Sequence, residues 1–308
     1  MRGSRHRLFV LVFSCVVGVL FLKVANASVI DNDAYCHNID TSFNNVVESV
    51  LGSDRAQTRS GFFMGIINAS TGEWVCSGAV QGTRNIYPAS SIKTLVAMAV
   101  LKRIDLGDYT LQTQVTINQP NANRECGASC SRYANGRVRT IEEMIFDSIT
   151  WSSNLATNQL IDLATKSFIN QTAAAVGAPS LKVVRKVYNN INPEPEITAR
   201  NESSALGYAE LYREISTGRL GYLSEASRTH LVSVLAQQRH NNRLNDRFPN
   251  GVTFYHKTGT TSDSSSDAGF YYINDQYIVV LVGLQNFRSY STLQRIGHQA
   301  FTLTADYF

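Results

Sequence analysis

The sequence predicts an α/β (α+β) protein whose sheet is built from both ends of the chain, with a helical lobe inserted between them. Short apolar stretches of strand length lie at 62–79 and again at 252–284. Apolar residues at helical spacing fill nearly all of residues 89–240 between them. Strands from both ends can then form one mixed sheet, and the intervening helices form a lobe of their own.

The first 27 residues form a separate segment. Three arginines and an uncharged apolar run from Leu8 to Leu22 precede small residues at 25–27, where cleavage could occur. This is the pattern of a secretory signal peptide, and the run is short for a spanning helix. We therefore expect a periplasmic or secreted protein of residues 28–308, with no stable membrane anchor after cleavage.

The net charge of +4 arises entirely from this segment. It holds four of the 28 basic residues and none of the 24 acidic ones, so the remaining chain has 24 of each. A near-neutral chain argues against a nucleic-acid or anionic membrane partner. The six histidines include no His-Glu-x-x-His or other tight cluster. We expect no metal, no cofactor and a monomeric protein.

Four cysteines remain after cleavage, namely Cys36, Cys76, Cys126 and Cys130. An even number in an exported chain fits two disulfides, with three possible connectivities. Cys126 and Cys130 are close together in a loop-like stretch, so we favour that pair. Cys36 with Cys76 follows by elimination, and four free thiols are the alternative.

The elements follow in order along the chain. Residues 40–50 have helical spacing, and strands at 62–68 and 74–79 flank a hairpin turn. A helix beginning near Ser90 and ending near Ile104 follows Pro88. Further helices are predicted at 141–149, 155–168, 205–215 and 223–235, then strands at 252–257, 268–273 and 277–284, and a closing helix at 292–303. The α/β lobe is thus 28–88 with 245–308, and the helical lobe is 89–244.

Ser90 and Lys93 are three residues apart at the start of a predicted helix, so their side chains share a face. A serine hydroxyl is a poor nucleophile at neutral pH, and a desolvated lysine can act as its base. The helix N-terminus favours negative charge developing there. The alternative is an N-cap serine followed by a surface lysine.

Two further motifs follow this one. Ser152-Ser153-Asn154 begins a helix, and Lys257-Thr258-Gly259 ends an apolar strand. Lysine and threonine can bind a carboxylate, and glycine lets a substrate approach the backbone. Taken singly, the first motif could be a plain N-cap and the second an exposed strand end.

Together and in this order, the three motifs resemble the signature of serine β-lactamases and penicillin-binding proteins. The resemblance covers about residues 40–308 and is closest to the class A-like branch. It implies catalytic or substrate-binding roles for Ser90, Lys93, Ser152, Asn154, Lys257, Thr258, Gly259 and Thr260.

In this resemblance Ser90 is the acylated nucleophile, Lys93 takes or relays its proton, and Ser152 passes a proton to the leaving nitrogen. Asn154 binds the side-chain amide of the substrate, and Lys257 with Thr258 holds its carboxylate. The backbone N–H groups of Ser90 and Thr260 form the oxyanion hole.

The sequence departs from the family pattern in two places. Class A enzymes usually have Ser-Asp-Asn, whereas Ser153 stands in the middle here. Their deacylating glutamate lies in Glu-Pro-Glu-Leu-Asn, which the segment beginning at Glu194 resembles. The next helix begins unusually soon, near Ser203, and without gaps Val187 falls at the glutamate's place. Glu194 is the candidate base and Glu196 a weaker one; a solvated loop residue is the alternative.

The leading hypothesis is an exported serine hydrolase that opens β-lactam amides through a Ser90 acyl-enzyme. The alternatives are a D,D-peptidase or acyl transferase acting on peptidoglycan stem peptides, and a β-lactam sensor that acylates without turnover. No Gly-x-Ser-x-Gly elbow is present. We interpret His256 as a strand-surface residue. Arg243 or Arg247 could assist carboxylate binding, although we favour a surface position for both.

Overall fold

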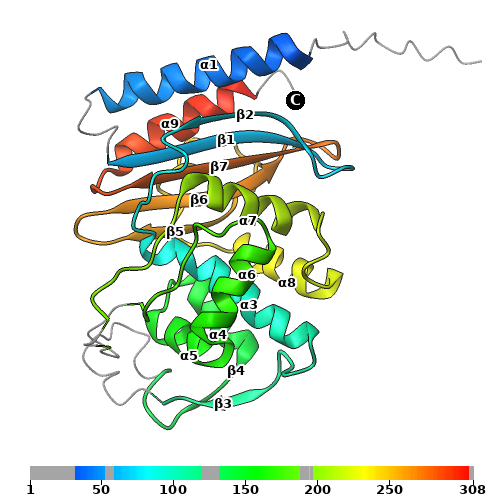
Figure 1. Cartoon of the computed structure of the whole chain (residues 1–308), viewed down its shortest axis with the longest axis vertical. Coiled ribbons are helices and arrows are strands. Elements are labelled where there is room, and N and C mark those ends of the chain that lie inside the picture. Colours follow the sequence, from blue (N-terminus) through cyan, green and yellow to red (C-terminus); the bar gives the residue numbers. More distant parts are fainter. Residues whose placement is uncertain (1–31, 53–58, 119–131, 188–193, 195–196, 305–308) are drawn as a thin grey trace, which may run out of the picture. The chain divides into compact units, whose positions relative to one another are not determined.

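The computed structural model describes residues 32–52, 59–118, 132–187, 194 and 197–304 (Figure 1). The predicted signal segment, Cys126, Cys130 and Glu196 lie outside the described residues. The signal peptide, the Cys126–Cys130 disulfide and the role of Glu196 as the weaker candidate base therefore stay predictions.

Five strands form an antiparallel sheet in the order β2-β1-β7-β6-β5. They are β1 (Ser60–Asn68), β2 (Trp74–Val80), β5 (Tyr255–Thr260), β6 (Ser265–Tyr272) and β7 (Tyr277–Gln285). The prediction of one sheet built from both chain ends is confirmed. Every pairing is antiparallel, so the sheet is not of mixed orientation. Strands β1 and β7 are buried along nearly their whole length because helices cover both faces of the sheet.

Helices α1 (Asn32–Leu51) and α9 (Tyr290–Leu303) cover one face of the sheet, and α7 (Ala205–Thr217) lies on the other (Figure 1). Apolar residues of α1 and α9 pack with those of β1 and β7 in one core cluster. A disulfide between Cys36 and Cys76 ties α1 to the edge strand β2. This confirms the predicted pairing of these two cysteines.

The helical lobe surrounds α3 (Lys93–Asp105), whose residues 93–101 are all buried. Around it pack α4 (Ile141–Thr150), α5 (Asn154–Ala164), α6 (Lys166–Ala175) and α8 (Glu225–Leu235). A helix buried on all sides forms the centre of a lobe. This burial fixes the N-terminal end of α3, where Lys93 of the Ser-x-x-Lys motif is the first residue.

Several elements differ from the prediction. The single helix expected over 155–168 is two helices, because Thr165 adopts a positive φ of 69° and its hydroxyl caps α6. Two strands of three residues each, β3 (Gln114–Thr116) and β4 (Val138–Thr140), were missed because they are too short to show a period. Strand β5 runs from Tyr255 to Thr260 and not over 252–257, so the Lys-Thr-Gly motif lies inside it.

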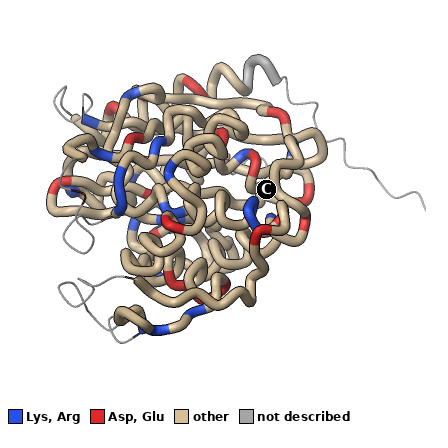
Figure 2. Tube along the Cα trace, turned by 60° about the horizontal axis from the view of Figure 1, so that its bottom comes forward, with Lys and Arg blue, Asp and Glu red and all other residues tan. Residues whose placement is uncertain are grey.

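Charged residues are spread over the described trace. Figure 2 shows Lys and Arg interspersed with Asp and Glu, and neither sign gathers in one region. Of the helices that the structure describes, none combines the length and the apolar character needed to cross a membrane.

Candidate active site

Three elements converge at a cavity of about 220 Å³. They are the turn η1 (Ala89–Ile92), which precedes α3, the connection between α4 and α5, and strand β5. The cavity is lined by Ser90, Ser152, His240, Asn242, Arg243, Thr258, Thr260 and Tyr290. Four of the predicted site residues thus share one cavity, although they are far apart in sequence.

Ser90 lies in the 3-10 turn η1, which directly precedes α3. The preceding residue, Ala89, has a φ of 50°, a strained conformation for a residue with a Cβ. Ser90 is half-buried and opens onto the cavity. Its hydroxyl makes no hydrogen bond to another described residue. The hydroxyl is therefore exposed to a ligand rather than engaged in the fold.

Lys93 is fully buried at the start of α3. Its Nζ lies 2.7 Å from the Ser152 carbonyl oxygen, 2.7 Å from Asn154 Oδ1 and 3.3 Å from Ser152 Oγ. Burial, and then the nearby charge of Lys257, lower the pKa of Lys93 well below its usual value. A lowered pKa makes the neutral amine, which is the basic form, available nearer neutral pH.

The Ser152 hydroxyl lies between two lysines. Lys257 donates to Ser152 Oγ at 3.0 Å from the other side. Burial and the charge of Arg243 lower the pKa of Lys257 to about 7, against the opposing effect of Asp267. Ser152 itself has a φ of 57°, a second strained position at this cavity. The arrangement can pass a proton from one amine toward the cavity through a hydroxyl.

The serine at the middle of Ser-Ser-Asn has a structural role. Ser153 is the N-cap of α5, and its Oγ accepts from the Ala156 amide at 3.2 Å. Aspartate and serine are comparable N-caps, so this departure from Ser-Asp-Asn preserves the helix start. Asn154 is held in place through the hydrogen bond from Lys93.

Gly259 is required by the fold where strand β5 meets the Ser90 turn. A Cβ there would lie 2.6 Å from the Pro88 carbonyl oxygen and 2.8 Å from the Ser91 amide nitrogen. The same carbonyl accepts from Ser91 Oγ at 2.7 Å and from Ser266 Oγ at 3.0 Å. Strand β5 and the Ser90 turn are therefore in direct contact, and glycine permits it.

Arg243 is not a surface residue, and this interpretation from the sequence is wrong. It is only 4% exposed, donates to Thr260 Oγ1 and lies over the Tyr290 ring at 4.5 Å. Sequence reasoning also missed His240, Asn242 and Tyr290, since no motif marks the irregular segment after α8 or the start of α9. Arg247, in contrast, is exposed.

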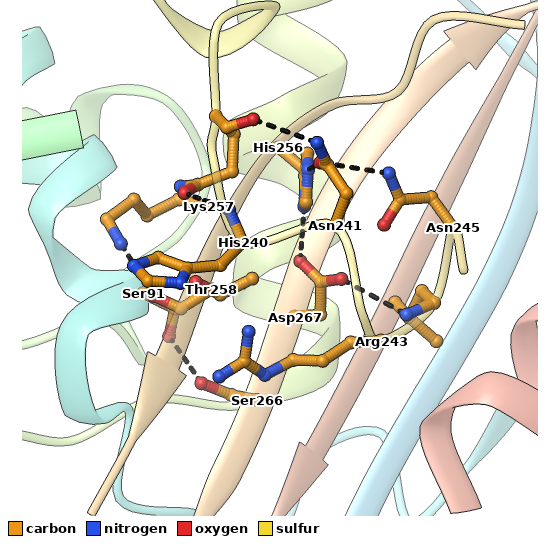
Figure 3. Close-up of polar contacts among 12 residues, drawn as sticks. Ser91, His240, Asn241, Arg243, Asn245, His256, Lys257, Thr258, Ser266 and Asp267 are labelled. Carbon is orange, nitrogen blue, oxygen red and sulfur yellow. Dashed lines mark hydrogen bonds and ion pairs between the residues drawn. The ribbon is translucent and has the colours of Figure 1, made fainter. Parts of the chain in front are cut away.

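His256 is also buried rather than on the strand surface. Its Nδ1 donates to Asp267 Oδ1 at 2.7 Å, and both side chains are fully inaccessible (Figure 3). The strand β5 alternates, so His256 and Lys257 point to opposite faces of the sheet. A lone histidine beside the motif gave no sign of its buried partner, which comes from β6.

Glu194 is not among the described residues that line this cavity. Its carboxylate accepts from Lys166 Nζ and from the Lys186 amide, each at 2.8 Å. Lys166 follows the C-terminal end of α5, whereas Asn154 begins that helix, about 15 Å along its axis. Burial opposes ionisation, but the hydrogen bonds from Lys166 and Lys186 outweigh it and lower the pKa of Glu194. We therefore do not assign the deacylating role to Glu194.

Val187 contacts α5 in the half of that helix nearer the cavity. Its amide donates to Asn158 Oδ1 and its carbonyl accepts from Asn158 Nδ2, both at 2.9 Å. Asn158 is about one helical turn beyond Asn154. The valine side chain is buried and has no group that could activate water. This placement agrees with the ungapped alternative drawn from the sequence.

Comparisons with known proteins show which family the chain belongs to. The model of a family described as "Beta-lactamase enzyme family" matches residues 42–302. No curated protein matches the chain.

Solved structures with this fold are numerous. A β-lactamase from Sphaerobacter thermophilus is 22% identical, with a TM-score of 0.71 over 87% of this chain and 97% of that chain. A β-lactamase from Chitinophaga pinensis is 19% identical, with a TM-score of 0.72 over 88% of this chain and 99% of that chain. PBP-A is 22% identical, with a TM-score of 0.69 over 85% and 96%, and a leucine-to-glutamate variant of it was solved as an acyl-enzyme complex with penicillin-G.

Proposed function

Because the chain belongs to the β-lactamase enzyme family, we propose that β-lactams acylate it at Ser90 and that the acyl group leaves slowly. One observation carries the proposal: Lys93 and Lys257 converge on the Ser152 hydroxyl beside a cavity onto which Ser90 opens. These residues supply each group that acyl transfer to serine needs.

In the first step, Lys93 acts as the base. The Ser90 oxygen attacks the lactam carbonyl carbon while its proton passes to Lys93, whose pKa is lowered by burial. The developing oxyanion lies toward the backbone N–H groups of Ser90 and Thr260, both at the cavity wall.

In the second step, the C–N bond of the lactam breaks. The proton on Lys93 passes through Ser152 Oγ, 3.3 Å away, to the leaving nitrogen. The hydrogen bond from Lys257 to Ser152 Oγ holds that hydroxyl in place. The product is an ester on Ser90 with the ring opened and the proton balance closed.

The substrate carboxylate is expected at the other end of the cavity. Arg243, Thr258 and Thr260 line that wall, with Lys257 buried behind it. Arg243 forms no ion pair with a described residue, and its buried Nε has no hydrogen-bond partner among them. A buried cation without a counter-ion suits an anionic ligand.

Release of the acyl group is the slow half of this proposal. Glu194 is engaged with Lys166, and the nearer residue Val187 is apolar. Among the described cavity residues there is no carboxylate. General-base help is worth about a hundred- to ten-thousandfold, so its loss leaves a long-lived acyl-enzyme.

A second candidate is a peptidase or acyl transferase acting on peptidoglycan stem peptides. It is favoured by the valine at 187 and by the similarity to PBP-A, a protein that forms an acyl-enzyme with penicillin-G as the variant noted above. Either activity belongs outside the cytoplasm, in keeping with the predicted signal segment.

The test mixes the protein with a chromogenic cephalosporin and follows both absorbance and intact mass. We expect a burst close to one equivalent, a covalent adduct on the peptide containing Ser90, and a slow steady rate. Steady turnover at tens per second, without an adduct, would favour an efficient β-lactamase. Absence of both burst and adduct would overturn the proposal.

A further inference from the structure

A buried ionisable pair lies outside the cavity lining, on the face of strand β5 opposite to Lys257. His256 and Asp267 are both fully inaccessible, and Nδ1 of the first donates to Oδ1 of the second at 2.7 Å. A buried carboxylate is costly unless it is paired and hydrogen-bonded. Neither residue lines the cavity, so neither touches a substrate there.

The second polar atom of each side chain contacts the same short segment. Asp267 Oδ2 accepts from the Leu244 amide at 3.2 Å, and His256 Nε2 lies 2.9 Å from Asn241 Oδ1 (Figure 3). Asn241 and Leu244 flank Asn242 and Arg243. The pair therefore holds both sides of the two residues that project from this segment into the cavity.

The segment needs such support, because residues 241–244 belong to no helix or strand. Gln294 of α9 donates to the Asn242 carbonyl at 3.2 Å, but this contact is exposed. Gly297 of α9 packs directly against the Leu244 backbone, with no room for a Cβ. The His256–Asp267 pair adds a buried contact, from Asp267 to the Leu244 amide, and a partly buried one, from His256 to Asn241.

We propose that His256 and Asp267 are positioning residues that hold segment 241–244 so that the Arg243 guanidinium meets the carboxylate of the substrate. The inference rests on the proposed function, in which Arg243 binds that carboxylate. It names residues that act on substrate preference without lining the cavity. The expected consequence is specific: losing the pair weakens recognition of the carboxylate and leaves the chemistry at Ser90 intact.

The experiment compares acylation rate constants for one cephalosporin as its free acid and as its methyl ester. The ratio of the two constants measures how much the carboxylate contributes. In Arg243→Ala we expect this ratio to fall by about tenfold to a hundredfold, as for loss of a charge-assisted hydrogen bond. Asp267→Asn and His256→Gln should lower it in the same direction, with the ester rate unchanged.

Non-additivity provides the sharper readout. If the pair acts through Arg243, the double variant Arg243→Ala/Asp267→Asn has the same ratio as Arg243→Ala alone. Tyr271→Phe is the matched control, since it removes a buried hydrogen bond to Thr304 on the same face of β6. It should lower the melting temperature and leave the ratio at the wild-type value.

Each outcome decides between alternatives. A wild-type ratio in both Asp267→Asn and His256→Gln overturns the positioning role, as does an equal loss for acid and ester. His256→Gln carries the test if Asp267→Asn does not fold. Failure of the unaltered protein to react with either compound overturns the proposed function itself, and this inference with it.

Discussion

The two halves of the proposed reaction depend on regions that are built differently. The acylation region consists of Ser90, Lys93, Ser152 and Lys257, which stand in or beside regular helices and strands. The release segment, residues 176–204, has neither helix nor strand among its described residues. Its backbone at 183–187 is instead held by side chains of Asn158, Asn170 and Asn201.

This difference teaches how far a short motif can be trusted. In the acylation region, spacing along an element fixes which side chains meet, because the buried core sets the register of the element. In the release segment, the same number of residues can follow many paths. Glu194 has the neighbours of the family's glutamate in sequence, yet Lys166 and Lys186 hold it elsewhere.

The largest expected effect is the loss of Ser90. Ser90→Ala should abolish covalent labelling by any β-lactam, since the cavity then has no nucleophile. Ser91→Ala is the matched control, because Ser91 is buried and bonded to Pro88 and Tyr208. That variant should still be labelled, though its stability should fall. Intact mass spectrometry gives the answer, and an adduct persisting in Ser90→Ala would rule out the nucleophile assignment.

A gain of function tests the other region. Val187→Glu places a carboxylate on the cavity-side half of α5, and we expect release of the acyl group to speed up by about a hundredfold. In Val187→Gln the new side chain is as large as glutamate but is not a base, so release of the acyl group should stay slow. The decay of the adduct after removal of free β-lactam measures this. Equal rates in the two variants would show that Val187 does not face the acyl carbon.

Adding one methyl group at Gly259 should disrupt the contact between strand β5 and the Ser90 turn. Gly259→Ala would overlap the Pro88 carbonyl and the Ser91 amide, so the turn must shift. We expect acylation to slow by about tenfold or more, because small displacements of reacting groups are costly. Adding Ser266→Ala relieves a side-chain contact only. If that second change restores the rate, the backbone clash is not the cause.

The pH dependence of acylation follows from the two lysines. Activity should rise as Lys93 loses its proton, which its lowered pKa brings toward neutral pH. It should fall above about pH 7 in the free enzyme, because Lys257 then loses the charge that attracts the carboxylate. A bound carboxylate raises the pKa of Lys257, so this fall moves to higher pH at saturating substrate.

A fixed charge provides the control. Lys257→Arg keeps a cation at every working pH, so its acylation profile should lack the falling limb, at a reduced rate. The profile of the methyl ester should lack that limb as well. A falling limb that survives in both cases would belong to a group other than Lys257.

Much of the fold could be predicted from the sequence, since long apolar periods mark α1, α3, α4, α7 and the three C-terminal strands. That Ser90, Lys93, Ser152 and Lys257 belong to one site was implied by the resemblance of their motifs to the family signature. The buried positions and contacts of Arg243, His256 and Asp267 could not be predicted this way. Their roles come from contacts between β5, β6 and an irregular segment, and such contacts have no local pattern.

The smallest expected effect is the most discriminating for the release segment. The sequence motif predicts that Glu194→Gln slows turnover while the acylation burst survives. The structure predicts a change of less than about twofold in both, because the lowered pKa of Glu194 makes it a weak base and its carboxylate, bonded to Lys166 and to the Lys186 amide, does not line the cavity. Loss of this partly exposed ion pair should reduce stability by about 1 kcal/mol or less. Lys166→Met removes the same ion pair and leaves the carboxylate, so it separates the two accounts. Slow turnover in Glu194→Gln with normal turnover in Lys166→Met would restore Glu194 as the base.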